Sequence, residues 1–299
     1  MVATRNSTQF YTWNGYRCAY EMQRSSESRG TPLLLIHPIG VGLSRHFWQR
    51  FCQQWQQSNC PNPIYNPDLL GCGDSDMPRI AYTPEDWANQ LQYFIETVVK
   101  VPVIVVVQGA LFPVAIDLAL HGSNWVRGSI LAGPPALPVM AKEGNPNGQK
   151  LIWNLFFGTP LGNGFYRYAR REKFLRSFSE RQLFAQPEDV DRPWLEMLQA
   201  GAANPDSRYA VFSFLAGFWR RDYREEMSRI SQPTLVVIGE AASSISREGK
   251  QDNADRRQDD YRRTLPNGET VVIEGRNVLP YETTNKFVDA IVPFVTRLG

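Results

Sequence analysis

The chain has 299 residues, of which 42% are hydrophobic and 21% are charged. This balance is typical of a globular protein and excludes disordered, collagen-like and coiled-coil chains. The net charge of +2 argues against a nucleic-acid partner, since no broad basic excess is present. No apolar run reaches the ~20 residues that would span a bilayer. The only histidines are His37, His46 and His121, so nothing after residue 121 can act as an imidazole base.

The four cysteines indicate a reducing compartment. Cys18, Cys52, Cys60 and Cys72 form no C-x-x-C pair and have no histidine cluster with zinc-ligand spacing. Their low density in a chain of this length does not suggest a disulfide framework. The polar N-terminus also lacks the apolar stretch of a signal peptide. We therefore expect structural cysteines, a cytoplasmic location, and no metal or other cofactor.

The first part of the chain alternates between predicted strands and helices. Asn14-Gly15 predicts a hairpin turn. The apolar run 33–36 predicts a strand that is buried on both faces. Residues 44–57 place their aromatic residues on one helical face. A strand then leads into a loop rich in glycine and aspartate, and Thr83 caps the next amphipathic helix.

The alternation continues through most of the remaining sequence. Residues 101–122 predict a strand, a sharp turn and a helix. Further buried strands are predicted within 128–135, 233–240 and 269–275, and residues 285–298 predict a terminal amphipathic helix. Strands and helices in this order favour right-handed crossovers and a mostly parallel sheet. The predicted fold class is therefore α/β.

One long segment interrupts this alternation. Residues 137–230 contain no convincing strand and predict an all-helical insertion into a core formed by residues 1–136 and 231–299. Their many aromatic residues predict the hydrophobic core of a small subdomain, with room for an apolar chamber beneath it. The basic residues between 167 and 176 predict a solvated face that could also attract an anionic headgroup or partner. The charged run 247–263 predicts a solvated helix.

Taken together, the motifs resemble the α/β-hydrolase superfamily. They are a strand ending in HPIG, the loop DLLGCGDSD, the strand–turn–helix segment VVVQGALFPVAIDLA, a helical insertion, then PTLVVIGE and EGRNVLPYE. The similarity covers essentially the whole chain and is to capped members of the epoxide-hydrolase and haloalkane-dehalogenase kind. It implies a twisted, mostly parallel sheet flanked by helices, with an inserted helical cap over the carboxyl ends of the strands, where such sheets bind ligands.

The resemblance also implies where a nucleophile would lie. In the family this residue occupies the centre of a G-x-S-x-G turn, and the matching segment here is Val107-Gln108-Gly109-Ala110-Leu111. The nucleophile position is then Gly109, which has no hydroxyl, thiol or carboxylate. Bulky Val107 and Leu111 replace the flanking glycines, which suggests a relaxed turn, although Gly109 could still accept a positive φ.

The positions implied for the acid and the base lack the expected residue types as well. The acid falls on Ala242, and an alternative placement after the sixth strand offers none. The base falls on Asn277, or on Arg276 with a one-residue shift. An Asn amide cannot act as a general base near neutral pH. The resemblance therefore implies a triad in which all three positions are degenerate.

The implied pocket contains backbone donors and few reactive side chains. Ala110 and Ile39 would supply the oxyanion-hole amides, since Pro38 has no N–H. His37 is expected to bond to loop backbone, and His46 and His121 are expected at the surface. The pocket candidates are His37, Pro38, Ile39, Gln108, Gly109, Ala110 and Asn277.

Three functional hypotheses follow from these residues. The first is a pseudoenzyme that binds a small apolar ligand or a protein partner. The second is an unconventional hydrolase- or lyase-type enzyme that uses His37 with Asp74, or Cys72, in the same pocket, although Asp74 and Asp76 are more typical of turn stabilisation. The third is an interaction protein whose pocket is filled by its own side chains. The sequence favours the first.

Overall fold

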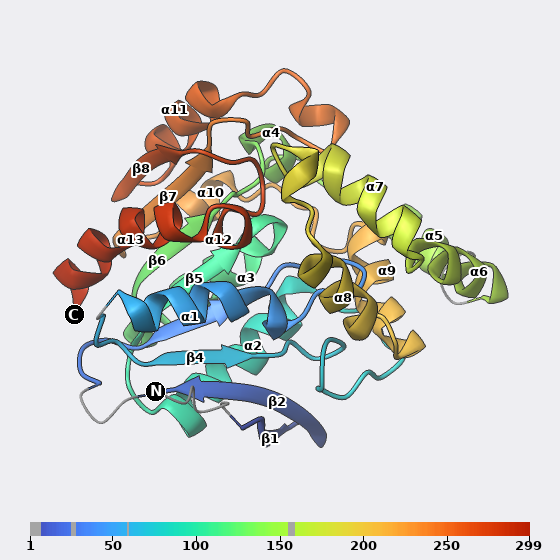
Figure 1. Ribbon diagram of the computed structural model, residues 1–299, viewed down its shortest axis with the longest axis horizontal. Coiled ribbons are helices and arrows are strands. Elements are labelled where there is room, and N and C mark those ends of the chain that lie inside the picture. Colours follow the sequence, from blue (N-terminus) through green and yellow to red (C-terminus); the bar gives the residue numbers. More distant parts are fainter. Residues whose placement is uncertain (1–6, 25–27, 59, 155–158) are drawn as a thin grey trace.

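An eight-stranded sheet runs through the molecule (Figure 1). The computed structural model describes residues 7–24, 28–58, 60–154 and 159–299. The strand order is β1-β2-β4-β3-β5-β6-β7-β8, with β2 antiparallel to both neighbours and parallel pairing from β4 to β8. The strands are β1 (Gln9–Trp13), β2 (Tyr16–Gln23), β3 (Leu33–Ile36), β4 (Ile64–Pro67), β5 (Val103–Gln108), β6 (Val126–Ala132), β7 (Thr234–Gly239) and β8 (Gly268–Ile273).

Helices cover both faces of this sheet, and the α/β prediction is confirmed (Figure 1). Side chains alternate between the faces, so Leu33 and Leu35 pack in one hydrophobic cluster while Leu34 and Ile36 pack in the other. No helix within the described ranges is long and apolar enough to cross a membrane. The cluster that contains Leu33 and Leu35 includes residues of α1 (Gln49–Gln57), α12 (Leu279–Glu282) and α13 (Thr284–Leu298). The cluster that contains Leu34 and Ile36 includes residues of α2 (Pro84–Phe94), α3 (Phe112–His121) and α11 (Ala254–Thr264).

Two local sequence signals formed the predicted structures. Asn14 and Gly15 have φ values of 48° and 81°, as the tight turn between β1 and β2 requires. Thr83 accepts a hydrogen bond from the Asp86 N–H, and the Asp86 carboxylate accepts one from the Thr83 N–H. This reciprocal capping box starts α2. Both predictions are confirmed. Each structure depends only on residues that are neighbours in the sequence, so the sequence alone could reveal it.

The described residues between β6 and β7 form helices and no strand, as predicted for the insertion. Whether residues 137–230 are a domain of their own stays a prediction. The helices are α4 (Leu137–Met140), α5 (Pro146–Ile152), α6 (Pro160–Ala169), α7 (Glu172–Gln182), α8 (Arg192–Gly201), α9 (Arg208–Ala216) and α10 (Arg224–Ser228).

The prediction of a separate core for this insertion is wrong for α8 and the residues before it. Trp194 of α8 lies 5.1 Å from the ring of Phe184 and 4.6 Å from the ring of Tyr281, measured between centroids. These rings join the same cluster as α1 and α13. A small cluster around Tyr166 and Phe212 is separate from it. Much of the insertion is thus an extension of the main core.

The charged run 247–263 also differs from its prediction. Its helix is α11, and one side of that helix is buried. Arg257 is 1% exposed, forms an ion pair with Asp252 and donates to the Pro134 carbonyl at 3.0 Å. The Tyr261 hydroxyl donates to the Pro135 carbonyl at 2.8 Å. The two carbonyl partners of this face lie more than a hundred residues away, which a local charge pattern cannot reveal.

Candidate functional site

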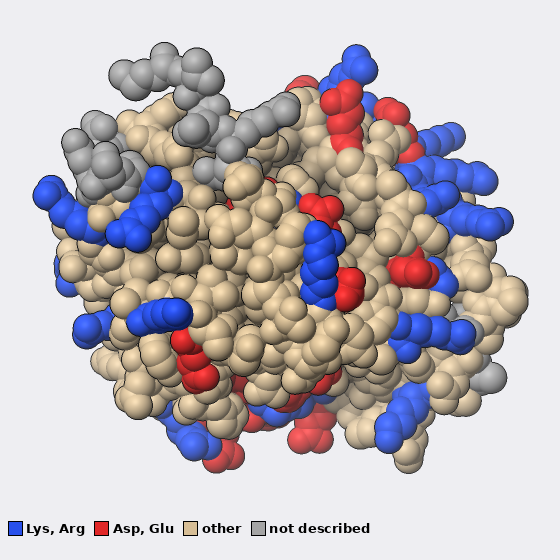
Figure 2. Space-filling model, turned by 90° about the horizontal axis from the view of Figure 1, so that it is seen from below, with Lys and Arg blue, Asp and Glu red and all other residues tan. Residues whose placement is uncertain are grey.

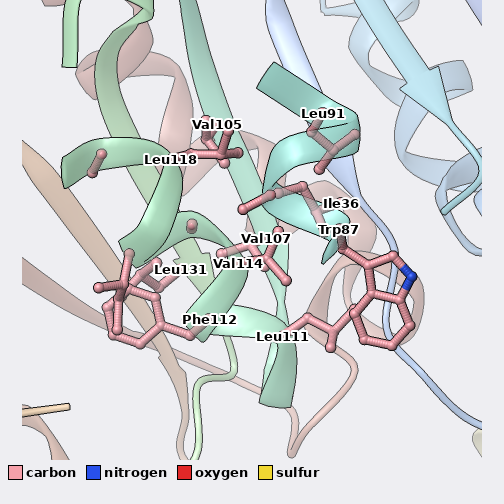
Figure 3. Packing of buried hydrophobic residues seen from close by; sticks show 14 of the residues in the cluster. Ile36, Trp87, Leu91, Val105, Val107, Leu111, Phe112, Val114, Leu118 and Leu131 are labelled. Carbon is pink, nitrogen blue, oxygen red and sulfur yellow. The ribbon is translucent and has the colours of Figure 1, made fainter. Parts of the chain in front are cut away.

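The turn between β5 and α3 lies at the carboxyl edge of the sheet and has the backbone shape of a nucleophile turn. Gly109 follows the last residue of β5 and has a φ of +64°, in the left-handed region. Val107 and Leu111 are each 1% exposed and point into the core near Ile36 and Trp87 (Figure 3). The expectation of a relaxed turn is therefore wrong, because the bulky flanking residues pack beneath the turn rather than in it.

The space over Gly109 is open. A Cβ atom placed on Gly109 would meet no described atom within 4 Å. Gly109, Ala110 and Ile39 are all partly exposed. Because Ile36 pairs with Val107, the turn after β3 ends beside the turn after β5. The two turns thus meet at this edge beside open space at position 109, and Gly109 itself places no reactive side chain there.

His37 is held by loop backbone on both sides of its ring. The side chain is fully buried. Its Nε2 accepts from the Leu69 N–H at 3.1 Å, so Nδ1 carries the proton and donates to the Pro38 carbonyl at 2.8 Å. Burial lowers the pKa of His37, which favours this neutral form. The expected backbone contact is confirmed, and neither ring nitrogen is free to accept a proton from a ligand.

A buried ionic network beside His37 was not predicted from the sequence. The Arg45 guanidinium forms ion pairs with Glu21 at 3.0 Å, with Asp74 at 2.7 Å and with Asp68. Asp68 is fully buried and also accepts from the backbone N–H groups of Arg45 and Asp74, each at 2.8 Å. Two weak signals pointed to it: an arginine inside an aromatic run and an aspartate directly after a buried strand. The network fixes the glycine- and aspartate-rich loop after β4.

Cys72 lies in this loop as a protonated thiol. The side chain is 4% exposed, and burial raises the pKa of the Cys72 thiol. A thiol of raised pKa is a weak nucleophile because the thiolate is the reactive form. All four cysteines are free thiols, as expected for structural residues. The side chains named in the second hypothesis therefore all serve packing or structural contacts here.

Asn277 is tied to two other parts of the chain. Its backbone carbonyl accepts from Gln108 Nε2 at 2.6 Å, which connects it to the strand that precedes Gly109. Its Nδ2 donates to the Gln182 carbonyl at 2.7 Å, and its N–H donates to the Leu183 carbonyl at 3.1 Å. The side-chain amide thus acts as a donor to backbone at the end of α7.

Arg276 connects the loops in which the resemblance places the acid and the base. Its Nε donates to Ser243 Oγ at 2.8 Å, next to the buried Ala242. Its Nη1 donates to the Arg181 carbonyl at 2.7 Å, and its N–H donates to Glu282 at 2.8 Å. A guanidinium–hydroxyl bond therefore joins the loops after β7 and β8. The sequence pattern suggested Arg276 only as a shifted base position and gave no signal for Ser243.

Two cavities are prominent among the described residues, and both lie away from Gly109. One of about 150 Å³ lies between the β1–β2 hairpin and α2, and one of about 360 Å³ lies in the insertion beside α6. The predicted pocket between Ile39, Gly109 and the insertion stays a prediction. In the part of the chain that the structure describes, no group of three or more His, Cys, Asp or Glu side chains could hold a metal ion.

Comparisons with known proteins agree with this architecture. Residues 33–290 match the profile of the Alpha/beta hydrolase family. Uncharacterized proteins of Mycobacterium bovis and Mycobacterium tuberculosis are 36% identical over 90 residues, which is 28% of this chain and 22% of theirs. The chain thus matches about a fifth of the length of these relatives.

Solved structures show the same fold over nearly the whole chain. A thermophilic esterase from Thermogutta terrifontis is 18% identical, with a TM-score of 0.72 over 99% of each chain. The epoxide hydrolase CorEH is 17% identical, with a TM-score of 0.74 over 99% of this chain and 100% of its own. The enol-lactonase from Burkholderia xenovorans LB400 is 15% identical, with a TM-score of 0.70 over 96% and 100%. Since the family match covers most of the sequence, this chain belongs to the Alpha/beta hydrolase family.

Proposed function

We propose that this protein is a pseudoenzyme that binds a ligand at the edge of a hydrolase-type sheet and does not hydrolyse it. The observation that carries this proposal is Gly109, which keeps the positive φ of a nucleophile turn without a nucleophilic side chain. A covalent intermediate requires an attacking oxygen, sulfur or nitrogen at this point. The Ala110 and Ile39 amides could still bind a ligand oxygen.

The surroundings of Gly109 support binding without proton transfer. The Arg276 guanidinium donates to Ser243 Oγ and to the Arg181 carbonyl, so it serves as a hydrogen-bond donor here. The Asn277 amide donates to the Gln182 carbonyl. His37 uses both ring nitrogens on backbone groups. With the triad removed, the remaining rate is at most what binding and an oxyanion hole supply.

A small apolar ligand is the favoured occupant, and a protein partner is the alternative. The open space over Gly109 argues against the third hypothesis, in which the protein's own side chains fill the pocket. A small ligand in that space would gain from excluding water along the sheet edge. A protein partner would instead place a side chain there.

Activity-based labelling and ester turnover test the absence of catalysis. We expect a fluorophosphonate probe to leave the purified protein unlabelled and ester substrates to react no faster than with heat-inactivated protein. An active serine esterase treated in parallel shows that the probe and substrates work. Labelling of the native fold, or turnover that Gly109→Ser alters and Gly15→Ser does not, would overturn the proposal.

Native mass spectrometry of freshly purified protein tests ligand binding. We expect a reproducible bound small molecule whose occupancy falls in Gly109→Ser, since the added hydroxymethyl group enters the open space. Gly15→Ser is the matched control, because Gly15 lies in the β1–β2 turn, has a positive φ as well, and would also meet no atom within 4 Å of an added Cβ. An apo mass for the parent, or equal occupancy in both variants, would contradict a small ligand at Gly109.

A further inference from the structure

The larger cavity lies in the helical insertion, between α6 and the residues that connect α8 to α9. Its volume of about 360 Å³ lies within the range of small-molecule sites, roughly 300–1,000 Å³. Arg167 lies in the last turn of α6, and Arg170 is the residue that directly follows this helix, three positions on and on the same side. Arg208 comes from the start of α9. Three guanidinium groups therefore line one opening.

These arginines are only partly neutralised by the protein. Arg208 pairs with Asp206 at 2.7 Å and also donates to the Pro205 carbonyl at 2.6 Å, whereas its Nε is buried without a hydrogen-bond partner among the described residues. Arg170 reaches only the carbonyls of Ala202 and Ala203, at 3.3 and 3.4 Å. Neither Arg167 nor Arg170 has an ion pair within the described ranges. Three positive groups and one negative group leave a net charge of +2 at the cavity.

The remaining wall is fixed by its own hydrogen bonds. The Tyr166 hydroxyl bonds Ser207 Oγ at 2.7 Å, and Ser207 donates to the Asn204 carbonyl at 2.7 Å. Tyr166 is 1% exposed, and these two hydrogen bonds hold its side chain in place. Tyr166 lines the same cavity as Arg167, Arg170 and Arg208.

We propose that the cavity lined by Arg167, Arg170 and Arg208 binds the phosphate group of a small phosphate ester or a lipid headgroup. The planar guanidinium fork matches phosphate oxygens in a two-point geometry, and a dianion would balance the net charge. Lys and Arg side chains gather at the end of the molecule where the insertion lies (Figures 1 and 2), which raises the local concentration of anions. This site goes beyond the function proposed above and does not involve Gly109.

Calorimetric titration with inorganic phosphate and with glycerol 3-phosphate at low salt tests the site. We expect saturable binding of one ligand per chain. Arg167→Gln/Arg170→Gln should weaken binding about tenfold or more, because charge-assisted hydrogen bonds are lost. The control Arg171→Gln/Lys173→Gln removes the same charge from the next part of the insertion and should change affinity less than about twofold. Circular dichroism and thermal melts verify that both double variants fold.

Vesicle flotation then distinguishes the source of the phosphate. Vesicles of phosphatidylcholine with phosphatidic acid are compared with phosphatidylcholine alone. A lipid headgroup is supported if the parent binds the acidic vesicles, glycerol 3-phosphate competes with this binding, and the cavity variant does not bind. Phosphate binding without flotation supports a soluble ester. No saturable phosphate binding, equal loss in both double variants, or flotation that the cavity variant retains would overturn the proposal.

Discussion

The carboxyl edge of the sheet differs between the β3–β4 side and the β5–β8 side. On the first side, buried charges such as Arg45 and Asp68 fix the loops. On the second, the loops are joined by side-chain to backbone bonds of Gln108 and Asn277 and by the bond between Arg276 and Ser243. Buried ionisable groups are therefore not in themselves a sign of chemistry. Here the β3–β4 side, called the charged side below, holds the network of Arg45 and Asp68, and the β5–β8 side holds the open space beside Gly109.

The largest expected loss of stability comes from disrupting the ionic network of the charged side. Arg45→Met should reduce the free energy of unfolding by roughly 3–5 kcal/mol, because it leaves Asp68 buried without its cation. Chemical denaturation measures the loss. Arg297→Met removes an ion pair with Glu269 in which both side chains are more than half exposed, and it should cost less than about 1 kcal/mol. Equal effects in the two variants would mean that the buried network does not fix the loops of the charged side.

A glycine-to-alanine substitution on each side of the sheet edge should reduce the free energy of unfolding by unequal amounts. Gly73 and Gly109 both have positive φ, so alanine is strained at either position. A Cβ on Gly73 would lie 2.1 Å from the Asp68 carboxylate, whereas a Cβ on Gly109 meets nothing within 4 Å. We expect losses of roughly 2–4 kcal/mol for Gly73→Ala and about 1–2 kcal/mol for Gly109→Ala. A larger loss of stability for Gly109→Ala than for Gly73→Ala in denaturation curves would show that the space beside Gly109 is occupied.

The bond between Arg276 and Ser243 should have a smaller effect. A double-mutant cycle with Arg276→Ala and Ser243→Ala should give a coupling energy of about 0.5–1.5 kcal/mol for this partly buried hydrogen bond. Arg192 and Glu196 form an exposed pair on α8 and should couple by roughly 0.3–0.5 kcal/mol. A coupling at Arg276 no larger than this would mean that the two loops are held by other contacts.

A pH dependence of stability is expected from Asp117, which lies on α3 on the β5–β8 side. Burial, with Glu85 nearby, raises the pKa of Asp117 on α3 to about 6 from 3.8, against the opposing effect of Arg221. The native protein therefore binds this proton more tightly than the unfolded chain does, so ionisation of Asp117 destabilises the fold. As the pH rises from about 4 to about 7, the parent should lose stability relative to Asp117→Asn.

Urea unfolding at several pH values measures this difference, with Asp222→Asn as the control. The guanidinium of Arg224 lowers the pKa of Asp222, so that carboxylate stays ionised across the same interval. The parent and Asp222→Asn should therefore differ by a constant amount over that interval. A constant difference for Asp117→Asn as well would contradict the raised pKa of Asp117.

Most of the fold was predictable because its signals are local or periodic. The apolar run 33–36 became β3, and Thr83 started α2. The position of Gly109 was also predictable, because strand, turn and helix follow one another directly in the sequence. One wrong expectation concerned Val107 and Leu111, since sequence spacing does not show that these side chains point into the core (Figure 3).

Contacts between distant segments could not be predicted. Arg276 and Ser243 are 33 residues apart, and Arg257 reaches a carbonyl 123 residues away. The lining of the arginine cavity brings Arg208 beside α6, although α7 and α8 lie between them in the sequence. The basic run 167–176 therefore indicated the charge of this region but not the cavity. Charge and burial patterns constrain each element, but the pairing of elements depends on the packed structure.

The packing of Trp194 joins the insertion to the hydrophobic core on one face of the sheet. Its indole packs between Phe47, Phe184 and Tyr281, which belong to segments on both sides of the insertion boundary. Loss of one such ring from a core costs roughly 3–5 kcal/mol. A shortened gene without the insertion would therefore encode a chain with an unfilled core, and gene fusions or deletions at its borders should yield misfolded protein rather than a smaller stable unit.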